Sequence, residues 1–322
     1  MSIPASLFAG LKLPVIAAPM FLVSGPDLVI ACCQQGIIGT FPALNQRSTQ
    51  GFAEWLTEIE RGLAGLATIP AAYGVNLIVH RTNPRLEADL NVCIQQRVPL
   101  VITSLGLVPS LIDRVHAYGG LVFHDVTTLR HAEKAAAAGV DGLILVCAGA
   151  GGHAGLLNPF AFVAAVRQFF NGTVILAGCI NSGHEIAAAQ LLGTDFAYMG
   201  TRFIATQESR ASDVYKQMIL SADPDDVTYT PAVSGVSGNF LTESLLRAGI
   251  DPTLPYINAN IGAELAGHDE QQADKKAWRD VWSAGQGVGT IEDAPTVAEL
   301  VARILNDYQR SRSGVNSTDS TH

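Results

Sequence analysis

Residues 142–155 (GLILVCAGAGGHAG) join a strand-like apolar segment directly to four glycines that surround one histidine. The uninterrupted apolar run at 142–146 is typical of a strand that is buried on both faces. Glycines at this density allow backbone N–H groups to turn inward and to approach a bound ligand closely. His153 is the one side chain of this loop that exchanges a proton near neutral pH. The segment therefore predicts a buried strand whose carboxyl end carries a site.

The same loop also fits a dinucleotide-binding fingerprint, because Gly149, Gly151 and Ala154 match the pattern GxGxxA. That fingerprint requires an acidic residue about 20 positions further along the chain. Residues 165–180 contain neither Asp nor Glu. The sequence therefore disfavours a Rossmann-type nucleotide site at this loop.

Further apolar, β-rich segments recur on both sides of this strand, with helical patterns between them. The predicted strands occupy residues 15–18, 37–41, 73–79, 100–103, 121–124, 142–146, 174–177 and 196–199. Helix ends are marked as well: Ser182 and Glu185 form a capping box, and Gly193 follows the last helical residue. This succession of β/α units predicts a TIM barrel, an α/β fold, with a doubly wound sheet as the alternative.

The alternation of strands and helices ends after residue 205. Residues 206–280 mix Ser, Gly, Asp and Pro, and they predict an inserted lid or small helical domain over the barrel mouth. We expect the barrel to comprise residues 1–205 and 281–310, with a final helix near 294–308. The remaining residues, 311–322, are rich in Ser, Arg and Thr and predict a disordered tail.

The composition restricts the partners and the location of the protein. A net charge of −9 without clustered Lys and Arg disfavours nucleic acid and anionic membranes as partners. The five cysteines lie in apolar runs without CxxC pairing, so we expect buried thiols, no disulfide framework and no metal site. The N-terminus shows no signal-peptide pattern. We therefore expect a cytoplasmic protein.

Polar and glycine-rich residues follow several of the predicted strands. They are Ala18-Pro19-Met20, Asn76, His124-Asp125, Gly178-Cys179 and Gly200-Thr201-Arg202. Functional groups of TIM barrels gather at the carboxyl ends of the strands, and phosphate often binds after the last two strands. These residues therefore predict one functional rim, with Gly178, Gly200, Thr201 and Arg202 as a phosphate cradle.

On these motifs the chain resembles the nitronate monooxygenase family, formerly called 2-nitropropane dioxygenases, which are FMN-dependent TIM-barrel flavoproteins. The resembling segments span nearly the whole chain in order. They are residues 17–20 (AAPM), 74–77 (GVNL), 150–155 (AGGHAG), 199–203 (MGTRF) and 282–287 (WSAGQG).

The resemblance implies that FMN is the cofactor and that His153 is the catalytic residue, which contacts substrate and removes an acidic C–H proton. The implied cofactor-binding residues are Ala18, Pro19, Met20, Asn76, His124, Gly151, Gly152, Gly178, Cys179, Met199, Gly200, Thr201, Gly285 and Gln286. Of these, residues 18–20 and Asn76 would contact the flavin ring, and the segment 283–286 would reach back over it. His124 either contacts the flavin, where some relatives carry Lys, or makes a core hydrogen bond or a pair with Asp125.

The implied reaction is oxidation of alkyl nitronates with O2 to a carbonyl compound and nitrite, by a monomer or homodimer. Two departures bear on the substrate: Gly149 stands where many relatives have an acidic residue, and Ala154 stands where many have Arg. The alternative is an NAD(P)H-dependent FMN reductase of quinones or enoyl thioesters. Its candidate phosphate contacts are Lys275, Lys276 and Arg279. A flavin-binding protein without catalysis is disfavoured because His153 is retained.

Overall fold

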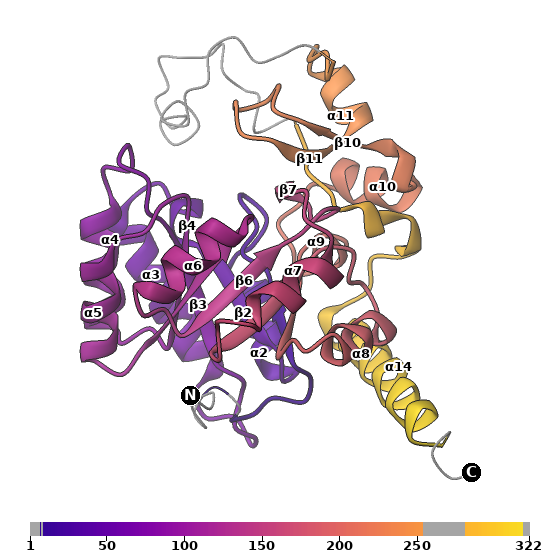
Figure 1. Cartoon of the computed structure of the whole chain (residues 1–322). Coiled ribbons are helices and arrows are strands. Elements are labelled where there is room, and N and C mark those ends of the chain that lie inside the picture. The colour runs from indigo at the N-terminus through magenta and orange to yellow at the C-terminus, as the bar shows by residue number, and fades with distance from the viewer. Residues whose placement is uncertain (1–6, 8, 254–280, 318–322) are drawn as a thin grey trace.

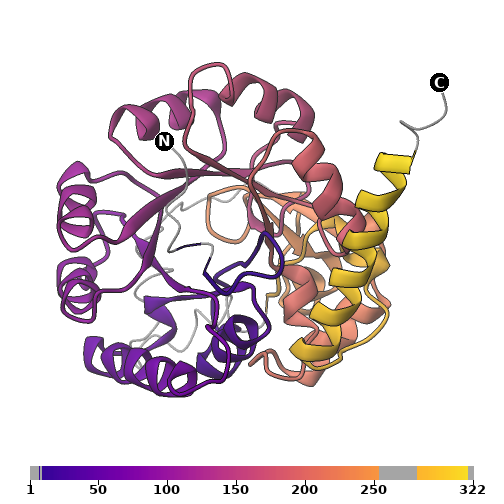
Figure 2. The same cartoon turned by 90° about the horizontal axis from the view of Figure 1, so that it is seen from below.

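In the computed structural model, the residues that are described are 7, 9–253 and 281–317. Parallel strands close into a barrel in the order β1-β2-β3-β4-β5-β6-β8-β9. Their bounds are β1 Val15–Ala17, β2 Ile38–Pro42, β3 Tyr73–Ile78, β4 Leu100–Ser104, β5 Leu121–Val126, β6 Gly142–Val146, β8 Thr173–Ala177 and β9 Phe196–Met199. Figure 2 shows the strands around the centre and the helices outside them. The predicted TIM barrel is confirmed, and every predicted strand overlaps an observed one.

Helices follow the strands and cover the outside of the barrel (Figure 1). They are α2 Pro26–Gln34, α3 Thr49–Leu63, α4 Leu86–Gln95, α5 Pro109–Ala117, α6 Leu129–Ala137, α7 Pro159–Val166, α8 Gly183–Leu191 and α14 Val297–Ser317, with the 3-10 turn η1 Ala43–Asn45 after β2. The capping box of Ser182 and Glu185 at the start of α8 is confirmed. The C-terminal helix α14 packs against α8 and α2 and so completes the outer ring.

The strands separate two apolar layers because successive side chains point to opposite faces of the sheet. Side chains such as Leu121, Phe123 and Ile144 pack together inside the barrel. Their neighbours Val122 and Leu143 pack between the strands and the helices. Burial on both faces explains why the strands are largely apolar rather than alternating.

A glycine at the first position of α8 permits the close approach of α14. A Cβ atom built on Gly183 would lie 2.1 Å from the Tyr308 nitrogen and 2.3 Å from the Ile304 oxygen. Because backbone atoms cannot rotate away, Gly183→Ala is expected to lower the free energy of unfolding by roughly 1–3 kcal/mol. Chemical denaturation measures this change. The control is Gly200→Ala, whose Cβ would meet nothing closer than the Ala18 Cβ at 3.7 Å; equal losses in the two variants would contradict the argument.

The chain after β9 does not contain helices alone. It forms α9 Thr201–Ile204, α10 Asp213–Ser221, the 3-10 turn η2 Pro224–Asp226, β10 Val227–Thr230, β11 Gly238–Leu241 and α11 Thr242–Arg247. The strands β10 and β11 pair with the short strand β7 (Gly152–His153) in a separate antiparallel sheet. The inserted segment therefore includes a β-hairpin, which Figure 1 shows over one end of the barrel. Residues 254–280 of the expected lid lie outside the described residues.

The C-terminal part re-enters the barrel through the 3-10 turn η3 (Gln286–Thr290) and then α14. This last helix continues to Ser317, so it extends into the segment for which the sequence predicts disorder. Its buried residues Val301, Ile304 and Tyr308 recur at helical spacing and hold it against the barrel. Residues 318–322 lie outside the described part of the chain.

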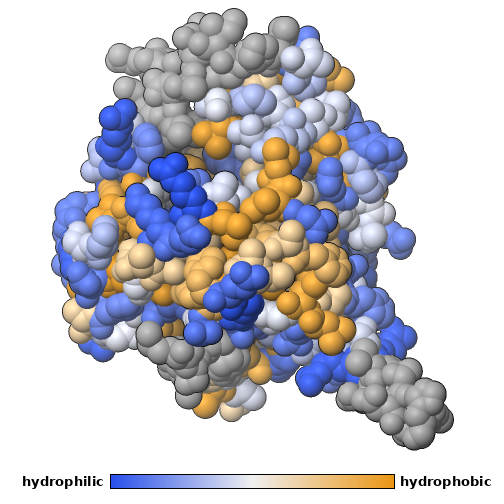
Figure 3. All heavy atoms as spheres, viewed as in Figure 1, coloured by the Kyte–Doolittle hydropathy of each residue, from blue (hydrophilic) through white to orange (hydrophobic). Residues whose placement is uncertain are grey.

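One face of the molecule carries apolar surface between hydrophilic side chains (Figure 3). Leu156 and Phe160, before and within the first turn of α7, are 73% and 70% exposed. Scattered exposed apolar residues are normal on monomeric proteins, so this surface does not decide between a monomer and a homodimer. Within the described ranges, no helix combines the length and the apolar character that crossing a bilayer requires.

Candidate active site

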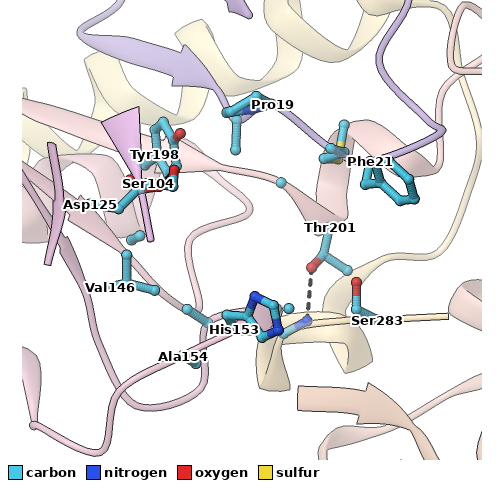
Figure 4. Close-up of a pocket in the computed structure, with 18 of the residues that line it drawn as sticks. Pro19, Phe21, Ser104, Asp125, Val146, His153, Ala154, Tyr198, Thr201 and Ser283 are labelled. Atoms are coloured by element: carbon cyan, nitrogen blue, oxygen red, sulfur yellow. Dashed lines mark hydrogen bonds between the residues drawn. The ribbon is translucent and has the colours of Figure 1, made fainter. Parts of the chain in front are cut away.

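A cavity of about 970 Å³ opens at the carboxyl ends of the barrel strands. The predicted site residues that line it are Ala18, Pro19, Met20, Asn76, His124, Gly151, Gly152, His153, Gly178, Cys179, Gly200, Thr201 and Gly285. Figure 4 shows His153 and Ser283 on one side of this cavity and Tyr198, Ser104 and Asp125 on another. The structure therefore brings together residues from seven separate segments of the sequence.

Two predicted cofactor-binding residues lie behind the lining. Met199 is 1% exposed and packs in the layer between the strands and the helices. The backbone nitrogen of Gln286 donates to the Gly149 oxygen at 2.9 Å, and a Cβ built on Gly149 would lie 3.0 Å from its Oε1. Gln286 thus supports the glycine loop from behind.

The glycines of the loop mainly allow two chain segments to touch. A Cβ on Gly151 would lie 2.8 Å from the Gly285 nitrogen, and one on Gly285 would lie 2.8 Å from the Gly149 oxygen. The sequence predicts that such glycines let a ligand approach the backbone. At Gly151 the nearest atoms belong to Ala284 and Gly285, and at Gly149 they are the Cys179 sulfur at 2.6 Å and the Gln286 side chain at 3.0 Å. This packing holds residues 283–286 beside the cavity.

His153 is held by the inserted segment. It lies in β7, which pairs with β11 so that His153 is opposite Gly238. Its Nε2 atom is 3.1 Å from the hydroxyl of Ser234, a residue that is 2% exposed. The Tyr229 hydroxyl donates to the oxygen of Ala154 at 3.1 Å. The imidazole is therefore fixed in orientation at the edge of the cavity, as a group that transfers protons requires.

His124 and Asp125 face opposite sides of β5. The His124 Nδ1 atom lies 2.7 Å from the Thr103 hydroxyl, and the charges of His131 and Lys134 on α6 act on the ring. Asp125 shares the interior side of the strand with Leu121 and Phe123. The core hydrogen bond considered for His124 is present, and Asp125 is the neighbour that points toward the barrel interior.

The buried imidazole predicts a loss of stability in acid. Burial lowers the pKa of His124 from 6.5 to about 4, with His131 adding to the shift. The unfolded chain therefore binds the proton first, and stability is lost as the pH falls from 6.5 toward 4. The expected loss over that window is about 3 kcal/mol. His124→Gln should lose correspondingly less in denaturation experiments across this pH range; parallel curves for both proteins would contradict the assignment.

The buried carboxyl of Asp125 changes the stability in the opposite direction over the same pH range. Burial raises the pKa of Asp125 from 3.8 to about 6, against a hydrogen bond from Ser104 that lowers it. The folded protein therefore binds this proton more tightly, and the contribution of Asp125 to stability decreases as the pH rises through that range. Because both proteins contain Asp125, its contribution cancels when the stability of His124→Gln is compared with that of the unmodified protein.

The ends of β8 and β9 line the cavity with backbone and small side chains. Arg202, expected beside this phosphate cradle, instead pairs with Asp293 at 2.8 Å. Gly178 and Cys179 have φ values of +130° and +55°, and the second of these lies in the left-handed region that favours glycine. The Thr201 hydroxyl accepts from the Gly285 nitrogen at 2.9 Å, so its own hydrogen remains available to a ligand. The expectation that all five cysteines are buried is wrong for Cys179, which is exposed beside the cavity.

Several lining residues were not singled out in the sequence. Trp282 stacks on Tyr215 with ring centroids 5.0 Å apart, and Tyr198 projects from β9 into the barrel mouth. The cationic groups Lys134 and Arg210 also line the cavity. The alternation of side chains along a strand could have identified Tyr198 of β9 as facing the barrel interior, as it does Asp125 of β5. Trp282 and Tyr215 are far apart in sequence, so no local sequence pattern predicts that their rings stack. Lys275, Lys276 and Arg279 lie outside the described residues.

Comparisons with known proteins agree with this fold. A family model described as nitronate monooxygenase matches residues 44–307. A nitronate monooxygenase from Paraburkholderia phytofirmans is 27% identical over 354 aligned residues, which cover 94% of each chain. The solved structure of FabK from Thermotoga maritima has a TM-score of 0.82 at 25% identity, over 98% of this chain and 97% of that one. The solved structure of nitroalkane oxidase from Streptomyces ansochromogenes has a TM-score of 0.81 at 25% identity, over 96% of this chain and 99% of that one.

Proposed function

The chain belongs to the nitronate monooxygenase family, and from this we propose that it is an FMN-dependent oxidoreductase that oxidises alkyl nitronates with O2 to a carbonyl compound and nitrite. The observation that carries the proposal is the placement of His153. A fixed imidazole borders a cavity of about 970 Å³ whose wall includes an open glycine cradle. The cysteine content favours a cytoplasmic location, and a monomer or homodimer is expected.

The cavity residues fit FMN in size and in chemistry. The volume lies within the usual range of cofactor sites, roughly 300–1,000 Å³. Gly200 lines the cavity, and a Cβ built on it would contact Ala18 and Met20 at 3.7–4.0 Å without a clash. Gly178, Cys179, Gly200 and Thr201 would hold the phosphate, and residues 18–20 and Asn76 would hold the ring. When bound, FMN supplies the electron transfer.

His153 would act on the substrate in one of two ways. A neutral nitroalkane must lose a C–H proton, and the imidazole is the group that would accept it. A nitronate is already an anion, so His153 would then orient it through a hydrogen bond. Ser234 keeps the ring in place in both cases. Trp282 and Ser283, which line the same cavity, would restrict the access of water to this position.

The lining favours a substrate with an alkyl part. Phe21, Leu22, Leu105 and Leu107 line the cavity, so an apolar group would be buried among them. Ala154 provides no guanidinium beside His153. We therefore expect the nitronate group to be oriented by the imidazole and neighbouring backbone rather than by an arginine pair.

A second candidate is an NAD(P)H-dependent FMN reductase acting on quinones or enoyl thioesters. The observation in its favour is that Lys134 and Arg210 line the cavity, where they could contact the phosphates of a nicotinamide dinucleotide. The likeness to FabK and the likeness to the nitroalkane oxidase are nearly equal, so they do not separate the two candidates.

An aerobic turnover assay separates the two. The FMN-loaded protein is supplied with propionate 3-nitronate, with nitroalkanes, and with NADH or NADPH plus a quinone or an enoyl thioester. Oxygen consumption with release of nitrite, and no oxidation of the nicotinamides, is the expected result. Rapid oxidation of NADH or NADPH with an inert nitronate would replace the proposal with the reductase.

A further inference from the structure

Three side chains on adjacent strands form a hydrogen-bonded row at the barrel mouth. The Asn76 amide nitrogen on β3 donates to the Ser104 hydroxyl on β4 at 2.7 Å. That hydroxyl donates to Oδ2 of Asp125 on β5 at 2.6 Å. All three residues line the cavity. The row therefore connects a carboxyl group to the amide that is expected to contact the cofactor.

The donor–acceptor direction of these hydrogen bonds determines which atom of the Asn76 amide faces the cavity. A carboxylate only accepts hydrogen bonds, so the hydrogen of Ser104 is used toward Asp125 and its oxygen accepts from Asn76. The same amide nitrogen also lies 3.4 Å from the carbonyl oxygen of Ile102, which is another acceptor. Both amide hydrogens of Asn76 thus point toward β4. This leaves the amide oxygen as the part of Asn76 that a ligand in the cavity can reach.

We propose that Asp125, acting through Ser104, is a positioning residue that makes Asn76 present its amide oxygen to an N–H group of the bound flavin ring. The inference rests on the proposed function, because it requires FMN in the cavity. It adds a residue pair that the family resemblance did not point to. Ser104 and Asp125 hold the amide and need not touch the cofactor themselves.

The surroundings of Asp125 indicate that its placement is costly. Among the described residues, its Oδ1 atom and the hydroxyl of Tyr198 are buried without hydrogen-bond partners. A buried polar atom without a partner loses its hydrogen bonds to water and destabilises the folded state. The pKa of Tyr198 is raised by burial and by the charge of Asp125, so the phenol stays protonated. Groups held at such a cost are enriched at functional sites.

The ionisation of Asp125 should change the strength of this row. A bond from a hydroxyl to a carboxylate is stronger than one to a neutral carboxyl group, and the pKa of Asp125 is about 6. Of the titratable groups near Asp125, Tyr198 on β9 is the one whose pKa the charge of Asp125 raises. His124 lies on the outer side of β5, and His131 and Lys134 on α6 act on His124. His153 borders the same cavity from the inserted segment.

The first test measures FMN affinity by quenching of flavin fluorescence. Ser104→Ala removes the central hydroxyl and is expected to raise the Kd of FMN about tenfold, and Ser104→Thr should restore most of the affinity. The matched control is Ser209→Ala, which removes a buried hydroxyl that donates to the Ile204 oxygen at 2.6 Å and does not line the cavity. An unchanged Kd in Ser104→Ala, or an equal loss in the control, would overturn the inference.

The second test uses pH. The FMN phosphate itself titrates near pH ~6, so the quantity compared is the ratio of the Kd of Asp125→Asn to that of the unmodified protein. This ratio should rise about three- to tenfold as the pH increases through 6, because only the unmodified protein gains the stronger bond. A ratio that does not vary with pH would overturn the role of Asp125. Failure of the unmodified protein to bind FMN would instead overturn the proposed function, and this inference with it.

Discussion

Replacement of His153 by Asn is expected to lower kcat/KM for a neutral nitroalkane by about 100- to 10,000-fold, the usual contribution of a general base. The loss for a preformed nitronate should be only about tenfold, because one hydrogen bond to an anion is removed and no proton transfer is needed. FMN content should not change, since the phosphate cradle lies on β8 and β9. Steady-state kinetics on a nitroalkane and its nitronate at one pH measure both effects.

A milder variant checks that the imidazole, rather than the loop, is responsible. Ser234→Ala removes the hydroxyl 3.1 Å from His153 Nε2 and leaves the base in place. It should reduce turnover of the nitroalkane by about three- to tenfold, the value of one ordinary hydrogen bond. Equal losses on nitroalkane and nitronate in His153→Asn would show that His153 does not remove the proton.

Gly200→Ala is expected to weaken FMN binding by about 10- to 100-fold, the value of one or two hydrogen bonds to a charged group. The added methyl group would lie at the cavity wall in contact with Ala18 and Met20, where it would narrow the space that the proposed cofactor site requires. The backbone at Gly200 has φ −103°, so alanine fits there without strain. Titration of the apo protein with FMN measures the change in Kd.

The stability measurement on the same variant provides the control. The thermal unfolding of apo Gly200→Ala should match that of the unmodified protein, whereas Gly183→Ala should unfold earlier and still bind FMN once folded. Normal FMN affinity in Gly200→Ala would show that the cofactor phosphate is not held at the end of β9. Loss of both properties in Gly200→Ala would show that the glycine is structural.

Local patterns were sufficient to predict the barrel. The strands are largely apolar, with polar residues such as Asn76 and Asp125 toward their carboxyl ends. The helix starting after Ser182 carries its capping signal in four residues. The small sheet could not be predicted in the same way. β10 and β11 have four residues each and β7 has two, so none shows a periodic pattern of its own. Their pairing depends on Gly238, where a Cβ would lie 2.6 Å from the Gly152 oxygen.

The candidate site was predicted in outline, because strand ends of a barrel converge whatever their sequence. The faces of single strands were harder to assign. His124 was a predicted site residue because it is titratable. The alternation of side chains along β5 points it toward Thr103 and points Asp125 toward the barrel interior. The glycines at 149 and 151 predicted a close approach, and the sequence does not reveal that Cys179 approaches the first and Gly285 the second. Such contacts depend on tertiary packing.

The most direct test of the proposed function is mixing the FMN-loaded protein with propionate 3-nitronate in the absence of oxygen, with NADH and NADPH in parallel samples. The visible absorbance of the flavin is followed in each. We expect a rapid change with the nitronate that is reversed when oxygen is admitted, and no change with either nicotinamide. Rapid bleaching by NADH or NADPH, together with an unchanged spectrum on adding the nitronate, would contradict the proposal.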